Sequence, residues 1–120
     1  MTKSVLIIGG EGYIGTVLSS YLLNKGYQVK SLDYLIYNNH SCVLNNYAND
    51  QYEFIFGDMK NKFVLDKALK DVENVVLLAG LVGDPITKKY PKEAKEINDI
   101  GVKAVIDACN NSGIKRLIFI

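Results

Sequence analysis

Residues 4–15 of this 120-residue chain read SVLIIGGEGYIG. Residues 4–8 predict a strand buried on both faces, and apolar residues at positions 14, 17, 18, 21 and 22 then follow the period of a helix. Gly9, Gly12 and Gly15 stand three residues apart between this strand and this helix. Glycines in that position are typical of a dinucleotide-binding turn, whereas a glycine-rich turn without the strand and the helix would be weak evidence.

Each of these three glycines has an expected role in such a turn. Gly9 allows the tight turn, Gly12 lets a pyrophosphate approach the backbone, and Gly15 lets the helix pack close to the strand at residues 4–8. The amides and the dipole of the helix would then face the phosphates. Tyr13 and Ile14 lie between these glycines and belong to the same predicted cofactor site.

The rest of the chain continues the alternation of strands and helices. Gly26 is expected to close the first helix in a left-handed conformation. Strands are expected at residues 27–33, 52–56, 74–79 and 115–120, with helices after Asn61 and from Pro91 and a short helix at 43–47. This alternation predicts an α/β fold, a Rossmann-type parallel sheet of about five strands in the order 3-2-1-4-5 with helices on both faces. Its ligand crevice would lie at the carboxyl ends of the first and fourth strands.

Composition excludes several classes of protein. The length of 120 residues, with 48% hydrophobic and 22% charged residues, predicts a single globular domain. The net charge of +1 provides no strongly basic surface of the kind that binds nucleic acid or anionic membranes. Its apolar runs are too short for a membrane span or a signal peptide, so a cytoplasmic protein is expected. A single His and two distant cysteines, Cys42 and Cys109, predict no metal site and no disulfide framework.

Asp33 is the second element of the predicted cofactor site. It ends the second strand, 18 residues after Gly15. A carboxylate there can accept hydrogen bonds from both hydroxyls of the adenosine ribose and would repel a 2′-phosphate, so NAD is predicted in preference to NADP. By itself Asp33 would be interpreted as a solvated strand end, and the glycines favour the functional interpretation. Tyr34, the next residue, is included in the site.

Two further strand ends complete the predicted site. Asp58 can accept from the adenine amino group with Met59 against the ring, although a turn carboxylate or a helix cap is an equal alternative. Ala79 and Gly80, the small residues at the end of the fourth strand, would let the ribose and the nicotinamide lie against the backbone. The alternative is that they form an ordinary turn. Asn98 is expected on the inner side of the helix from Pro91, bonded to the sheet backbone. The predicted cofactor-binding residues are Gly9, Gly12, Tyr13, Ile14, Gly15, Asp33, Tyr34, Asp58, Met59, Ala79, Gly80 and Leu81, with no catalytic or metal-binding residue.

Taken together, these motifs resemble the extended short-chain dehydrogenases/reductases, and more narrowly the NAD-dependent epimerase/dehydratase family. The resemblance rests on residues 9–15, Asp33, residues 57–59, residues 77–85, Asn98 and residues 113–117. It implies a nucleotide-sugar substrate and a homodimer. Glu11 departs from the family pattern, which has a small residue there. Two positions are open for its side chain: it points to solvent, or it lies near the pyrophosphate and adds repulsion.

The resemblance also implies a catalytic Ser or Thr after the fifth strand and a Tyr-x-x-x-Lys pair on the next helix, where the Tyr acts as general acid and base. These positions would follow Ile120. We therefore expect residues 1–120 to be an NAD(P)-binding domain truncated after the fifth strand, without the substrate-binding region and catalytically incomplete. The alternatives are a stand-alone NAD-binding or redox-sensing module and an assembly subunit without catalysis.

Overall fold

The structure is a computed structural model that describes residues 3–35, 46–79, 89 and 91–120, apart from the side chains of Glu93 and Ile97. The predicted site residues Gly80 and Leu81, and Cys42, lie outside the described residues. So does most of the helix predicted at 43–47, while residues 46–48 form a turn.

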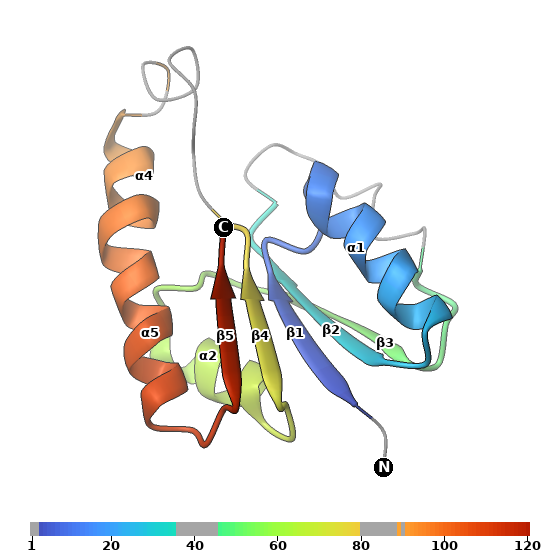
Figure 1. The fold of residues 1–120 in the computed structure, drawn as a ribbon. Helices are drawn as coiled ribbons and strands as arrows, with labels where there is room; N and C mark the ends of the chain where they lie inside the picture. Colours follow the sequence, from blue (N-terminus) through green and yellow to red (C-terminus); the bar gives the residue numbers. More distant parts are fainter. Residues whose placement is uncertain (1–2, 36–45, 80–88, 90) are drawn as a thin grey trace.

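The described residues form a five-stranded parallel sheet in the order β3-β2-β1-β4-β5 (Figure 1), which confirms the predicted topology. The elements in chain order are β1 Ser4–Ile8, α1 Tyr13–Asn24, β2 Gln28–Asp33, β3 Tyr52–Phe56, α2 Lys62–Leu69, β4 Asn74–Leu77, α4 Pro91–Lys95, the π-helical turn η2 Glu96–Gly101, α5 Val102–Asn110 and β5 Arg116–Phe119. The fourth strand ends two residues earlier than predicted, and the fifth is shorter at both ends.

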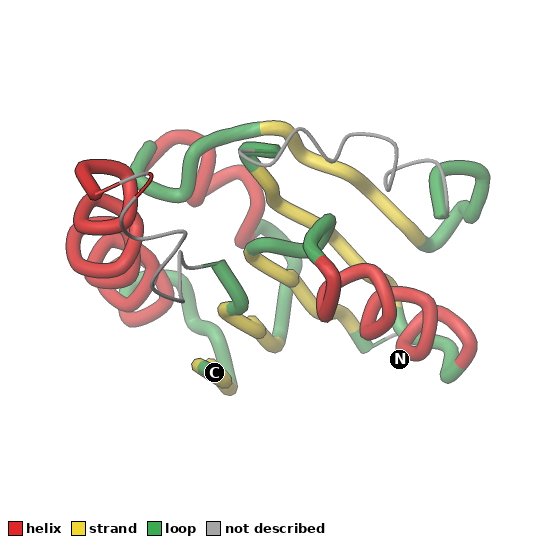
Figure 2. Tube along the Cα trace, turned by 90° about the horizontal axis from the view of Figure 1, so that it is seen from above, coloured by secondary structure: helices red, strands yellow, loops and turns green. Residues whose placement is uncertain are grey.

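Side chains from the two faces of the sheet make two separate cores, as the alternation along β1 shows. Leu6 and Ile8 pack in the larger core, under α2 and α5, while Val5 and Ile7 pack in the smaller core under α1. Figure 2 shows the sheet between these helical layers. The five residues of β1 are all buried, as predicted for a central strand covered on both faces.

The residues of α1 that face the sheet are not those that its apolar spacing predicts. Its fully buried residues are the small Gly15 and Ser19, whereas Val17 is 65% exposed, and Ile14 and Tyr21 are exposed as well. Small residues on the inner side let the helix backbone approach the sheet, so the buried stripe is narrower than the apolar one. Gly26 closes this helix with a positive φ of 88°, as predicted.

The Ser19→Ala variant is expected to be more stable than the wild type by about 1 kcal/mol. Ser19 is 1% exposed, and its hydroxyl has no hydrogen-bond partner among the described residues. Alanine removes this buried polar group and also has the higher helix propensity. Urea denaturation of the two proteins would measure the difference in the free energy of unfolding. The control is Ser20→Ala, one position along the same helix. It should not gain this stability, because the Ser20 hydroxyl donates to Asn46 and alanine loses that hydrogen bond.

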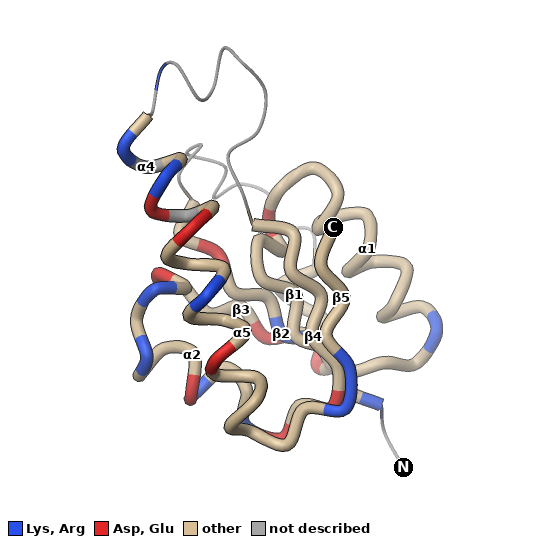
Figure 3. Tube along the Cα trace, turned by 60° about the vertical axis from the view of Figure 1, so that its left-hand side comes forward, with Lys and Arg blue, Asp and Glu red and all other residues tan. Residues whose placement is uncertain are grey.

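The helical segment from Pro91 to Asn110 covers the other face of the sheet. Gly101, Val105 and Cys109 face inward as predicted, and burial raises the pKa of the Cys109 thiol. The expected inward position of Asn98 is wrong, because Asn98 is exposed within η2. The π-helical turn there adds a residue to the helical repeat, which shifts side chains relative to the α-helical period. Acidic and basic residues alternate along this segment (Figure 3), so neither sign dominates it.

Candidate functional site

The turn after β1 lies between the ends of β2 and β4. The Gly9 N–H donates to the Leu32 carbonyl at 2.7 Å, and the Ala79 N–H donates to the Ile8 carbonyl at 3.0 Å. Gly9 has φ +88°, and a Cβ there would lie 2.7 Å from the Ala79 nitrogen. Only glycine combines this φ with such a close approach. The turn thus sits at the switch point of the sheet, where ligands of open α/β folds bind.

The other two glycines of the predicted motif differ in what surrounds them. A Cβ on Gly15 would lie 2.6 Å from the Gly10 Cα and from the Gly9 carbonyl oxygen, so Gly15 packs α1 onto the turn itself rather than onto β1. A Cβ on Gly12 would meet only the Gly9 carbonyl oxygen, at an ordinary 3.5 Å. Gly12 also has the extended backbone (φ −79°, ψ −176°) that any residue adopts. Packing among the described residues therefore leaves the space at Gly12 open.

The amino terminus of α1 is suited to an anion. Gly12 is the N-cap and has no side chain with which to satisfy the first amides of the helix. The first turn, residues 13–16, contains no acidic residue. Tyr13 is 91% exposed at this end, and Ile14 is exposed as well. Backbone N–H groups and the positive end of the helix dipole are thus available at the open face of Gly12.

Asp33 stands at the end of β2 with its carboxylate held by two backbone amides. The Glu11 N–H donates to Oδ2 at 2.9 Å, and the Leu35 N–H donates to Oδ1 at 2.7 Å. Leu35 adopts a left-handed φ of 56°, a strained conformation for a leucine. A carboxylate has about four acceptor positions, so each oxygen of Asp33 retains one for a ligand hydroxyl.

The structure excludes solvent exposure, one of the two positions open to the Glu11 side chain. Glu11 is 2% exposed, and its Oε2 accepts hydrogen bonds from the Ser31 hydroxyl at 2.5 Å and from the Tyr52 hydroxyl. The side chain turns under the glycine turn because these two hydroxyls, on β2 and β3, offer donors on the α1 face of the sheet. Burial, followed by the bond to Glu11, raises the pKa of the Tyr52 phenol, which therefore remains a donor.

Asp58 follows β3 and is linked to the long helical segment. Its Oδ1 accepts from the Lys60 N–H at 2.9 Å, which makes it the turn carboxylate of the alternative interpretation, while Oδ2 lies 3.5 Å from Lys60 Nζ. The same Nζ lies 2.6 Å from Oε2 of Glu96 in η2. This hydrogen bond raises the pKa of Lys60 and lowers that of Glu96. Lys60 thus connects the end of β3 to η2.

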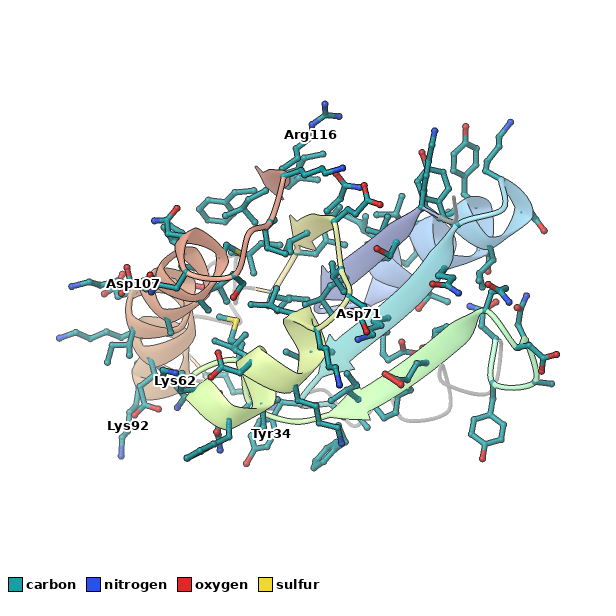
Figure 4. All side chains as sticks on the ribbon, turned by 90° about the horizontal axis from the view of Figure 1, so that it is seen from below. Tyr34, Lys62, Asp71, Lys92, Asp107 and Arg116 are labelled. Atoms are coloured by element: carbon teal, nitrogen blue, oxygen red, sulfur yellow. The ribbon has the colours of Figure 1, made fainter. Side chains whose placement is uncertain are left out.

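The Met59 side chain was predicted to lie against the adenine ring, but it points into the larger core instead. Met59 is 6% exposed and packs in the larger core, where its Cε takes up the space that a Cβ on Gly101 would need. Aromatic surface lies nearby instead, because Tyr34 and Phe56 are more than half exposed and their ring centroids are 5.6 Å apart. In Figure 4, Tyr34 lies at the edge of the molecule, away from the packed interior.

The structure brings together most of the predicted residues that it describes. Strand pairing places the ends of β1, β2, β3 and β4 along one edge of the sheet, with Ala79 half-buried beside Gly9. Phe56, Ser31 and Tyr52 were missed by sequence reasoning. Ser31 is two residues before Asp33 and so shares its face of β2, which was the one available signal. Tyr52 carries no such signal, because it lies far from Glu11 in the sequence.

Within residues 3–35, 46–79, 89 and 91–120, no three His, Cys, Asp or Glu side chains gather closely enough to hold a metal ion. The helices described there are all too short or too polar to span a bilayer.

Comparison with known proteins gives one family and a consistent group of relatives. A model of the NAD dependent epimerase/dehydratase family matches residues 5–120. A UDP-glucose 4-epimerase from Klebsiella pneumoniae is 33% identical, over 96% of this chain and 86% of that protein. The mouse sterol-4-alpha-carboxylate 3-dehydrogenase, decarboxylating, is 30% identical, and an inverting UDP-N-acetylglucosamine 4,6-dehydratase from Campylobacter jejuni is 31% identical. The chain spans 29% and 35% of the length of these two proteins.

Solved structures show the same fold. An epimerase from Methanothermobacter thermautotrophicus has a TM-score of 0.88 at 25% identity, with 98% of this chain and 34% of that chain covered. The UDP-glucose 4-epimerase of Brucella ovis, solved in complex with NAD, has a TM-score of 0.84 at 23% identity, with 98% and 35% covered.

Proposed function

The chain belongs to the NAD dependent epimerase/dehydratase family, and from that premise and the geometry of the turn we propose that residues 1–120 are an NAD-binding domain. The pyrophosphate lies over Gly12 at the amino terminus of α1, and Asp33 accepts the hydroxyls of the adenosine ribose. The adenine lies toward the ends of β2 and β3, beside Asp58 and Tyr34. The nicotinamide half runs past Ala79 toward Gly80 and Leu81.

The open space at Gly12 is the observation that carries this proposal. The chain's own packing requires the absence of a Cβ at Gly9 and Gly15, where the nearest backbone atoms would lie at 2.7 and 2.6 Å. At Gly12 the corresponding distance is 3.5 Å and the backbone is unstrained, so the fold does not require a glycine there. A ligand that approaches the helix amides closely supplies the reason.

The preference for NAD over NADP follows from Asp33. With both oxygens already bonded to backbone amides, this carboxylate cannot easily turn away from an incoming 2′-phosphate. Repulsion between the two anions and the loss of the ribose hydrogen bond then act together against NADP.

The proposed reaction of the whole protein is the epimerisation or dehydration of a nucleotide sugar. Support comes from the similarity to the UDP-glucose 4-epimerase of Klebsiella and to the UDP-N-acetylglucosamine 4,6-dehydratase of Campylobacter. Within the described residues we assign no acid or base. Tyr52 is unsuitable for that role, because its surroundings raise the pKa of its phenol, whereas a catalytic tyrosine needs a lowered one.

Titration of the protein with NAD and with NADP by calorimetry tests the proposal. The wild type is expected to bind NAD in a saturable manner and NADP more weakly. Asp33→Asn should lower the affinity for NAD by about 10-fold, the cost of weakening one charge-assisted hydrogen bond, and reduce the discrimination against NADP. Asp50→Asn, an exposed substitution of the same type before β3, is the control and should bind both nucleotides like the wild type. A folded wild-type protein that binds neither nucleotide would refute the proposal.

A further inference from the structure

Glu11 is a buried carboxylate inside the glycine turn, and its side chain reaches beyond the turn to the sheet. Four polar or charged residues are buried within the described part of the chain, and Glu11 is the one that carries a carboxylate. Charged groups are found inside proteins where hydrogen bonds compensate the loss of water. Here the hydroxyls of Ser31 and Tyr52 both donate to Oε2. The side chain therefore joins the turn to two strands, β2 and β3.

The backbone of the same residue makes the contact that matters for the ribose site. The Glu11 N–H donates to Asp33 Oδ2 at 2.9 Å. The side chain of Glu11 thus anchors the residue to β2 and β3, while its amide holds the Asp33 carboxylate. Since Ser31 and Asp33 lie on the same face of β2, the two contacts share one short stretch of strand.

A second observation shows that the turn and this network are fitted to each other. A Cβ on Gly10 would lie 2.1 Å from the Ser31 hydroxyl oxygen and 2.8 Å from the Ser31 Cβ. The hydroxyl that binds Glu11 therefore occupies the space that any side chain at position 10 would need. Gly10 is not one of the three spaced glycines of the motif, and this contact is the reason for a glycine there.

We infer that Glu11 is a positioning residue, which through Ser31 and Tyr52 holds the ribose-binding carboxylate of Asp33 in place and so sets the preference for NAD. This inference rests on the proposed function. Without the side-chain anchor, the amide of residue 11 would move with the turn, and Asp33 would lose one of the two donors that fix it. A carboxylate held by Leu35 alone can rotate, which weakens its bonds to ribose and lets it turn away from a 2′-phosphate.

The test is the ratio of the NAD and NADP affinities in variants of the network, measured by calorimetry on proteins whose folding is confirmed by circular dichroism. Glu11→Ala is expected to lower this ratio about 10-fold, the effect of one charge-assisted hydrogen bond. Glu11→Gln retains an oxygen acceptor and should stay within about 2-fold of the wild type. Tyr52→Phe removes one donor with the smallest change in volume and should lower the ratio about 3-fold, so it serves if Glu11→Ala does not fold.

Two further comparisons separate positioning from a general loss of stability. In an Asp33→Asn background, Glu11→Ala should leave the ratio unchanged, because Glu11 acts through Asp33. Glu53→Ala removes an exposed glutamate next to Tyr52 and should leave the wild-type ratio unchanged. Equal weakening of NAD and NADP by Glu11→Ala, or a Glu11→Gln protein that behaves like Glu11→Ala, would overturn the inference and leave the proposed function intact. A folded wild type that binds neither nucleotide would overturn both.

Discussion

Gly12→Asn is expected to lower the affinity for NAD about 100-fold while leaving the stability of the fold unchanged or slightly higher. Asparagine is among the best N-cap residues, and replacing a glycine cap with it is worth a few tenths of a kcal/mol. The extended backbone of Gly12 accepts it without strain, and its Cβ meets nothing closer than 3.5 Å. Its side chain, however, takes the amides at the start of α1 and fills the space proposed for the pyrophosphate. Losing two charge-assisted hydrogen bonds accounts for the expected factor.

Calorimetric titration with NAD and a thermal unfolding curve check both parts of this expectation. The matched control is Gly26→Asn, the same substitution at the opposite end of α1. A Cβ at Gly26 meets no described atom within 4 Å, and asparagine tolerates its left-handed φ of 88°. This control should bind NAD like the wild type. If folded Gly12→Asn also bound NAD with wild-type affinity, the pyrophosphate could not lie over the turn.

Gly15→Ala is expected to destabilise the protein by about 1–3 kcal/mol, although Gly→Ala inside an exposed helix normally stabilises by about 1 kcal/mol. The reversal of sign comes from the backbone atoms at 2.6 Å, since neither the Gly9 carbonyl nor the Gly10 Cα can yield without moving the turn. Urea unfolding should show the lower stability, and the thermal midpoint should fall by about 4 °C per kcal/mol. A Gly15→Ala protein as stable as the wild type would mean that α1 does not pack against the turn as described.

The two substitutions lie three residues apart in one motif and affect different properties. Gly12→Asn should separate binding from folding, whereas Gly15→Ala should damage folding first and binding only as a consequence. The motif predicts a ligand-facing role for Gly12 and a packing role for Gly15. The distances around a hypothetical Cβ, 3.5 Å at Gly12 and 2.6 Å at Gly15, support that division.

The order of the strands could be predicted because local patterns determine it. Apolar strands such as residues 4–8, separated by helices with recognisable caps, leave few parallel arrangements once crossovers are right-handed. Asn61 shows the same local logic, because its side chain accepts from the Phe63 and Val64 amides and starts α2 as predicted. Asp33 could be placed at the edge of the sheet because it ends a strand.

The misplaced residues depend on contacts between distant parts of the chain. The position of Met59 depends on Gly101 in η2, and that of Glu11 depends on Tyr52 at the start of β3. No periodicity in the sequence connects such pairs. Asn98 was misplaced for a different reason, because a π-helical turn breaks the regular period from which its inward position was derived.

The contact of Gly9 with Ala79 has a consequence for the order in which the site forms during folding. β1, α1 and β2 follow one another directly in the chain, and the bond from the Glu11 amide to Asp33 lies within this local stretch. The opposite side of the turn is formed by Ala79 after β4, which lies far from β1 in the sequence. Non-local contacts of this kind form late in folding because closing the intervening chain costs entropy. The proposed nucleotide site around the glycine turn is therefore complete only when β4 pairs with β1. Binding of a nucleotide would then indicate an assembled sheet and not an early folding intermediate.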